Sequence, residues 1–290
     1  MNDSVAQAFL QFSTQFEGKV PYMYVDVKDL VTVGVGNLID PIELAQNQPF
    51  VFKTDQTTPA TPDDIATDWN TVKNTPGLPQ QGHLAAKPLT KLMLTDDAIG
   101  QLVAQKAQAN EGILKQTPEF AGYENWPADA QLGILSMAWA MGPAFAQNGH
   151  WPTFRAAVAG LDWNAASDAC RMNDDGNPGL TPRNIADRVL FRDAAFAADT
   201  NNGMDPTTLQ YVPSGERATI QTASSGGDVS FLQQRLVVLR YPDVSDTATF
   251  DAPTDTAVRA FQTDAGLTAD GVVGPSTWAA LGTVLPAANA

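Results

Sequence analysis

The sequence has few of the residues that bind metals or form disulfides, with one cysteine and two histidines among 290 residues. A single cysteine, Cys170, excludes an intramolecular disulfide, and we expect it to be a small buried core residue. His83 and His150 lie far apart in the sequence, and no HExxH, paired-cysteine or EF-hand pattern accompanies them. We therefore expect neither a metal nor any other cofactor.

Positive charge is also scarce, because 17 Lys and Arg face 32 Asp and Glu, which leaves a net charge of −15. An acidic surface repels phosphate backbones and anionic lipid, so nucleic acid and bare membrane are poor candidates as partners. The same charge disfavours the anionic bacterial cell wall. Repulsion between exposed charges fades beyond about 8 Å at physiological salt, however, so a specific binding module can still bring the chain to the wall.

Long hydrophobic runs are absent, since no stretch approaches the roughly 18 apolar residues of a membrane span. The first residues, MNDSVAQAFLQF, lack the basic start and apolar run of a secretory signal. We therefore expect a protein that is made in the cytoplasm without a signal peptide and that does not insert into a membrane. The length of 290 residues and a hydrophobic content of 43% favour two folded domains.

The first forty residues change from a helical to a strand period. Apolar residues recur at helical spacing through residues 2–16, and Gly18 follows as a stop signal. Residues 22–27 and 31–36 then alternate between apolar and other side chains. With a turn at residues 28–30, this pattern predicts a β-hairpin.

The rest of the first domain is predicted to be mainly helical. Residues 45–88 contain six prolines and little periodicity, which indicates an insertion with a short helix around residues 63–73. Helical patterns with start signals then follow over residues 95–114, 127–141, 153–158, 162–171 and 182–198.

The C-terminal part begins with a polar stretch that is rich in Gly, Ser and Pro, which we interpret as a linker over residues 201–227. Residues 228–290 contain a degenerate repeat, in which F-D-A-P-T and a shorter V-G-P-S-T each follow a helical stretch. A unit this short cannot close a core alone, so the two halves are predicted to pack as a three-helix domain. Residues 1–200 then form the first domain.

Three polar side chains near the N-terminus have the chemistry that glycosidic bond cleavage requires. Glu17 falls at the end of the predicted first helix, where the helix dipole disfavours a charged carboxylate and so suits a general acid. Asp26 and Thr32 share one face of the predicted hairpin and pair directly across it if the turn is as predicted. They could then hold one water, and two carboxylates in different environments could act as acid and base.

The segment EGKVPYMYVDVKDLVTVGVGN resembles the catalytic segment of the T4-type phage lysozymes, in which a Gly-x-Gly follows the threonine, as Gly34 and Gly36 do here. These glycoside hydrolases cleave the bond between N-acetylmuramic acid and N-acetylglucosamine in peptidoglycan. The resemblance implies that Glu17 is the acid, that Asp26 with Thr32 positions the water, and that the anomeric carbon is inverted. It also implies an α+β, mainly α-helical fold, a lysozyme-like two-lobed domain with a small β-hairpin lobe.

The last sixty residues resemble the three-helix peptidoglycan-binding domain, through LQ-x-x-L, A-V-x-x-F-Q and D-G-x-x-G-P-x-T-W-x-x-L. This resemblance implies a small all-α wall-binding domain over residues 228–290 and peptidoglycan as the partner. The first domain departs from its family in two places. Asn37 stands where histidine is usual, which we expect to remove a buried partner of the strand turn, and residues 45–88 are longer than in the minimal enzymes.

Two alternatives to a muramidase stay open at this stage. A lytic transglycosylase needs one acid and no water-positioning pair, and a non-catalytic peptidoglycan-binding protein would keep the fold without the activity. The biological role is either that of a phage endolysin, released through a holin, or that of an antibacterial effector delivered by a secretion system. An effector would add an immunity or secretion partner, and in either role we expect a monomer.

Overall fold

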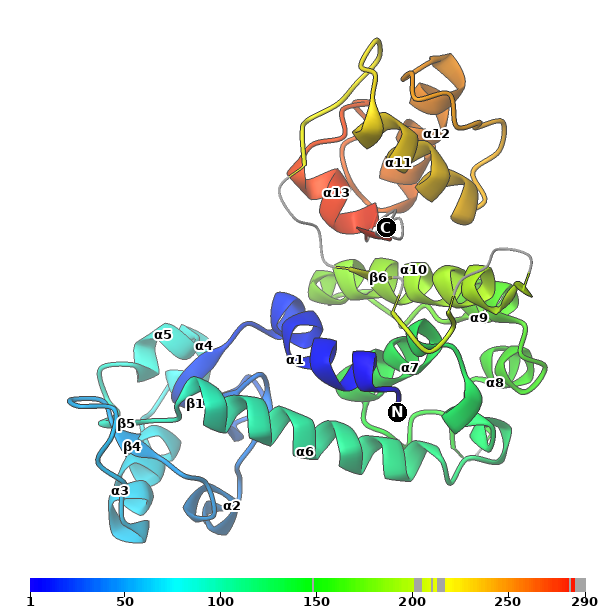
Figure 1. Cartoon of the computed structure of the whole chain (residues 1–290). Coiled ribbons are helices and arrows are strands. Elements are labelled where there is room, and N and C mark those ends of the chain that lie inside the picture. Colours follow the sequence, from blue (N-terminus) through cyan, green and yellow to red (C-terminus); the bar gives the residue numbers. More distant parts are fainter. Residues whose placement is uncertain (148, 201–204, 210, 213–216, 282, 285–290) are drawn as a thin grey trace. The chain divides into compact units, whose positions relative to one another are not determined.

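The computed structural model describes residues 1–147, 149–200, 205–209, 211–212, 217–281 and 283–284 (Figure 1). The chain divides into two compact units, each of which is described by itself. The hairpin unit comprises Phe9–Ala109, and the helical unit comprises Met1–Ala8 with Asn110–Ala290. Among the described residues, no helix combines the length and hydropathy that a membrane span needs. The predicted linker falls partly outside the described residues, and the predicted domain boundaries stay predictions.

The hairpin unit is built around a small antiparallel sheet that follows the first helix. The helix α1 (Asp3–Glu17) ends at Gly18, whose φ of +70° starts the turn into the sheet. The strands β1 (Val20–Val25), β2 (Val31–Gly34) and β3 (Asn37–Leu38) lie in the order β1-β2-β3. The predicted helix and hairpin are confirmed, while the short third strand was not predicted.

The predicted insertion folds into short elements that pack against the hairpin. The helix predicted around residues 63–73 is confirmed as α3, which begins with a capping box between Thr61 and Asp64. α3, α4 and α5 all contact β1. The elements over residues 42–93, which include the predicted insertion at 45–88, are α2 (Ile42–Gln46), β4 (Val51–Phe52), α3 (Pro62–Lys73), α4 (Leu78–Gln81), α5 (His83–Ala86) and β5 (Leu92–Met93).

The helical unit has α7 at its centre, and nearly every side chain of α7 is buried. α10 packs along α7, and Gly133 allows this because a Cβ there would lie 3.0 Å from Cζ of Phe191. Cys170 is 1% exposed, which confirms its expected burial. The elements from α6 onward are α6 (Asp96–Leu114), η1 (Pro118–Phe120), η2 (Tyr123–Asn125), α7 (Ala128–Met141), α8 (Pro152–Ala159), α9 (Trp163–Ala169), η3 (Pro178–Leu180), α10 (Thr181–Ala198), β6 (Tyr211–Val212) and β7 (Thr283–Val284).

The C-terminal part of the helical unit contains the helices α11 (Gly227–Val238), α12 (Ala252–Asp264) and α13 (Pro275–Leu281). Two buried glutamines show that its halves are structural copies. Gln233 on α11 donates to the carbonyl of Thr249 and to Oγ1 of Thr254. Gln262 on α12 donates in the same way to the carbonyl of Val272 and to Oγ1 of Thr277. The predicted internal repeat is therefore confirmed by matching hydrogen bonds.

Candidate functional site

Glu17, the predicted general acid, is the last residue of α1 and is exposed. Its carboxylate lies against the turn between β2 and β3, because a Cβ on Gly36 would be 3.4 Å from Oε2 of Glu17. Gly34 and Gly36 have φ values of +69° and +70°, a conformation that side chains disfavour. The two glycines therefore form a tight turn beside the carboxylate.

The direct pairing predicted for Asp26 and Thr32 is wrong by two residues. Tyr24 lies opposite Thr32, whereas the amide of Asp26 donates to the carbonyl of Leu30 at 2.9 Å. The reason is local, because Oδ1 of Asp26 accepts from the amides of Lys28 at 2.8 Å and Leu30 at 2.9 Å. The aspartate thus closes its own turn and shortens the strand that was expected to carry it.

Asp26 and Thr32 are instead diagonal neighbours on the hairpin. Diagonal positions lie roughly 7–8 Å apart in an antiparallel pair. A water that bridges two oxygens spans two hydrogen bonds of about 2.8 Å each, so the two side chains must extend towards each other from these positions to share a water. Thr32 is 5% exposed and its hydroxyl donates to the carbonyl of Leu30 at 3.2 Å, which leaves the oxygen's lone pairs as acceptors.

Tyr24 lies opposite Thr32 in the hairpin, two residues before Asp26. Burial, followed by the negative charges of Glu17 and Asp26, raises the pKa of Tyr24 to about 12. The Tyr24 hydroxyl therefore stays protonated at neutral pH. Sequence analysis had placed this tyrosine only on the face that Asp26 and Thr32 share.

His83 is the residue of this face that the sequence analysis missed, since it was considered only as a metal ligand. It begins α5 in the insertion, and its Nδ1 lies 3.2 Å from Oη of Tyr22. Its ring centroid lies 6.0 Å from that of Tyr24, in an edge-on arrangement. The insertion thus places an exposed imidazole beside Tyr24. No local sequence signal indicates this, because 59 residues separate His83 from Tyr24.

Asn37 was expected to remove a buried partner from the strand turn, and this expectation is wrong. Asn37 is 2% exposed, and its Oδ1 accepts from the amide of Val35 at 3.1 Å. The same oxygen would lie 3.1 Å from a Cβ on Gly34, so the asparagine fits under the turn. The amide side chain therefore supplies the buried acceptor that keeps the turn beside Glu17 satisfied.

The part of the chain that the structure describes contains no group of three or more His, Cys, Asp or Glu side chains able to hold a metal. A hollow of about 270 Å³ opens beside the turn that contains Asp26. Val27 and Asp29 line it from the hairpin, and residues 73–77, 79 and 80 line it from the insertion. Lys73 ties the two sides together by donating to the carbonyl of Asp29 at 2.5 Å.

Comparison with known proteins identifies the three-helix region that carries the paired glutamines. Residues 225–281 match the family model of a peptidoglycan binding domain. The C-terminal peptidoglycan-binding domain expected from its signatures is therefore confirmed, and it implies association with the cell wall. The match includes no residue of the hairpin unit. No curated protein matches the chain.

Proposed function

We propose that the chain is a muramidase, which hydrolyses the bond between N-acetylmuramic acid and N-acetylglucosamine in peptidoglycan. The observation that carries this proposal is the position of the Glu17 carboxylate against the turn at Gly36, on the same hairpin that carries Asp26 and Thr32. The peptidoglycan-binding domain on the same chain supports the choice of substrate. The resemblance of the hairpin segment to T4-type lysozymes supports the choice of bond.

In this mechanism Glu17 donates its proton to the glycosidic oxygen as the bond to the leaving sugar breaks. A water held between Asp26 and Thr32 attacks the anomeric carbon from the opposite face, and Asp26 takes up the proton that the water loses. Oδ1 of Asp26 is held by the turn, and Oδ2 has no hydrogen-bond partner among the described residues. This second oxygen is the acceptor for the water's proton.

The deciding experiment compares Glu17→Gln with Glu43→Gln in a turbidity assay on purified cell walls. Glu43 lies on α2 and is exposed, so its replacement changes the charge equally without touching the site. Loss of a positioned general acid costs typically 10²–10⁴-fold in rate. We expect Glu17→Gln to lose at least about 100-fold and Glu43→Gln to retain full lysis. Unchanged lysis by Glu17→Gln would remove the mechanism.

Mass spectrometry of the released fragments separates hydrolysis from the transglycosylase alternative. Hydrolysis leaves reducing sugar ends, whereas a transglycosylase leaves 1,6-anhydro ends and does not need Asp26 or Thr32. We expect reducing ends. We propose that this activity acts on the wall after release through a holin or delivery by a secretion system, and the genes that neighbour this one distinguish an endolysin from an effector.

A further inference from the structure

The peptidoglycan-binding domain is held on α10 by a buried ion pair within the helical unit. Arg235 on α11 contacts Asp193 on α10 with both terminal nitrogens, and Nη2 lies 2.9 Å from Oδ2. Neither side chain is exposed. Nε of Arg235 also donates to the carbonyl of Leu281 at 2.8 Å. A buried, fully hydrogen-bonded pair of this kind fixes one relative position of two helices, because any other leaves charges buried and unpaired.

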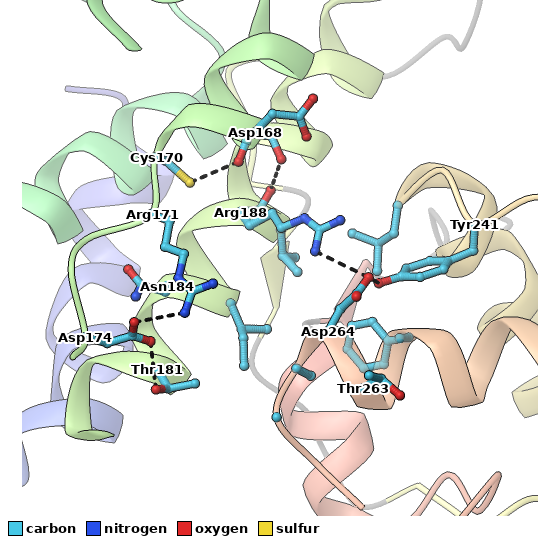
Figure 2. Close-up of a pocket in the computed structure, with 17 residues that line it drawn as sticks. Asp168, Cys170, Arg171, Asp174, Thr181, Asn184, Arg188, Tyr241, Thr263 and Asp264 are labelled. Carbon is cyan, nitrogen blue, oxygen red and sulfur yellow. Dashed lines mark hydrogen bonds and ion pairs between the residues drawn. The ribbon is translucent and has the colours of Figure 1, made fainter. Parts of the chain in front are cut away.

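A hollow of about 430 Å³ lies at this junction (Figure 2). Its lining includes an apolar group, here called the floor, of Ile185 and Val189 from α10 and Phe261 from α12. Tyr241 lies against Phe261 with ring centroids 5.9 Å apart and adds an aromatic wall. A volume in this range and an apolar floor with a few polar groups are typical of sites for small ligands.

The rim of the hollow carries charges of both signs. On the α10 side, Arg188 lies 3.8 Å from Asp264, and Arg171 lies 2.9 Å from Asp174. Each guanidinium has five N–H donors, so one carboxylate contact leaves most of them available. Asp168 pairs with Arg192 and Asp264 accepts from Oη of Tyr241, and their side chains are 61% and 49% exposed. A ligand that carries both carboxylates and an amine would find a partner for each.

Of the two parts of peptidoglycan, only the peptide has this chemistry. The glycan strand is uncharged where its lactyl carboxyl is joined to the peptide, whereas the stem peptide carries free carboxylates and, with a diamino acid, a free amine. We propose that the hollow between α10 and the peptidoglycan-binding domain binds the stem peptide. Arg171 and Arg188 take its carboxylates, Asp168 or Asp264 takes its amine, and the apolar floor takes its alanine methyl groups.

The proposed site contains residues from both parts of the helical unit. The family model matches residues 225–281, so Tyr241, Phe261 and Asp264 belong to the peptidoglycan-binding domain, whereas Arg171 and Arg188 do not. A ligand that bridges the two parts binds only the docked form, so its binding raises the melting temperature of the unit. The proposal depends on the peptidoglycan-binding domain and not on the muramidase activity.

The test is isothermal titration of the full chain with two probes, the tripeptide L-alanyl-γ-D-glutamyl-meso-diaminopimelate and the uncharged glycan chitotetraose. We expect the tripeptide to bind and chitotetraose not to displace it. Arg188→Gln should weaken tripeptide binding at least about tenfold, because the cation is lost from the rim. Arg259→Gln is the matched control, since Arg259 on α12 pairs with Asp255 and does not line the hollow.

A second variant keeps every rim charge and fills the space instead. Thr263 is exposed on α12 at the edge of the hollow, so Thr263→Trp should abolish tripeptide binding without changing the melting temperature of the free protein. Three results would each overturn the proposal. The tripeptide could fail to bind the wild type, Arg188→Gln and Thr263→Trp could both bind it as tightly as the wild type does, or chitotetraose could displace it. Neither probe contains a muramic acid bond, so failure of the muramidase proposal leaves this test intact.

Discussion

Two different kinds of sequence signature mark the C-terminal peptidoglycan-binding domain and the hairpin face, which is the face that carries Glu17, Asp26 and Thr32. In the domain, the signature residues Gln233, Gln262 and Trp278 are at most 1% exposed and build the fold. On the hairpin face, Glu17 is exposed and Asp26 is half-buried. Signature residues in a core determine how the chain packs, so the structure tests them. Exposed carboxylates leave the packing unchanged, so only a measurement of the reaction tests them. The difference explains why the domain is identified and the activity is a proposal.

The same comparison predicts how substitutions in the two regions will fail. Changes to the signature residues of the domain should act on the free energy of unfolding, because they leave buried groups without partners. Changes on the hairpin face should act on activity at nearly constant stability.

The largest effect is expected from Asp193→Ala, which leaves Arg235 buried without its carboxylate. Removing one partner of a buried ion pair typically costs about 3–5 kcal/mol. Asp255→Ala removes a partly exposed partner of Arg259 and should cost about 1 kcal/mol or less. Denaturant unfolding of both variants measures the difference, and similar costs would show that the docking of the domain on α10 is not specified by this pair.

The second largest loss of unfolding free energy is expected from Gln262→Ala. Gln234→Ala makes the same change at an exposed position and is its control. Gln262 accepts from the amide of Gly271 and donates to the carbonyl of Val272, so its loss leaves the buried amide of Gly271 without this acceptor. We expect a loss of about 2–4 kcal/mol and reduced binding to insoluble peptidoglycan. Gln234→Ala should stay within about 0.5 kcal/mol. If Gln262→Ala leaves the free energy of unfolding unchanged, this signature residue does not stabilise the fold.

A buried carboxylate outside both regions adds a pH dependence to the helical unit. Asp187 on α10 is 0% exposed. Burial raises its pKa from 3.8 to about 7, although the Arg183 charge opposes this. The folded state therefore binds more protons than the unfolded state between about pH 4 and 7, so its stability falls as pH rises through this window.

Asp187→Asn removes the titrating carboxyl and keeps the shape of the side chain. The stability difference between the variant and the wild type therefore measures the pH dependence that Asp187 causes. Above pH 7 the variant should be more stable than the wild type, because the wild-type carboxyl must then be charged while buried, and the gain should vanish towards pH 4. Thermal unfolding at pH 4, 5.5 and 8 follows the difference between the two proteins. A constant difference across this range would mean that the Asp187 carboxyl does not titrate within it.

The smallest effect on stability, with a large effect on lysis, is expected from Gly36→Ala. Gly36 and Gly77 have φ values of +70° and +73°, so alanine at either position should cost about 1–2 kcal/mol. Only Gly36 lies against Glu17. We expect lysis of purified walls to fall at least tenfold in Gly36→Ala and to remain within twofold in Gly77→Ala. Equal lysis by the two variants would show that the contact between Gly36 and Glu17 is not needed for activity.

Local elements could be predicted from the sequence, but contacts between them could not. The helix that ends at Gly18, the hairpin and the repeat with its two glutamines all follow from spacing and stop signals. The register failed by two residues because Asp26 closes its own turn. Asn37 was judged by the histidine it replaces, whereas its amide provides the buried acceptor itself.

By itself the sequence determined where helices begin and end, which residues form the core of the C-terminal domain, and which carboxylates are candidates for catalysis. These properties depend on periodicity and short-range signals, which act over a few residues. Only the tertiary structure placed His83 beside Tyr24 and Arg235 against Asp193. Such contacts join segments that are 59 and 42 residues apart, and packing selects them only once both segments have folded.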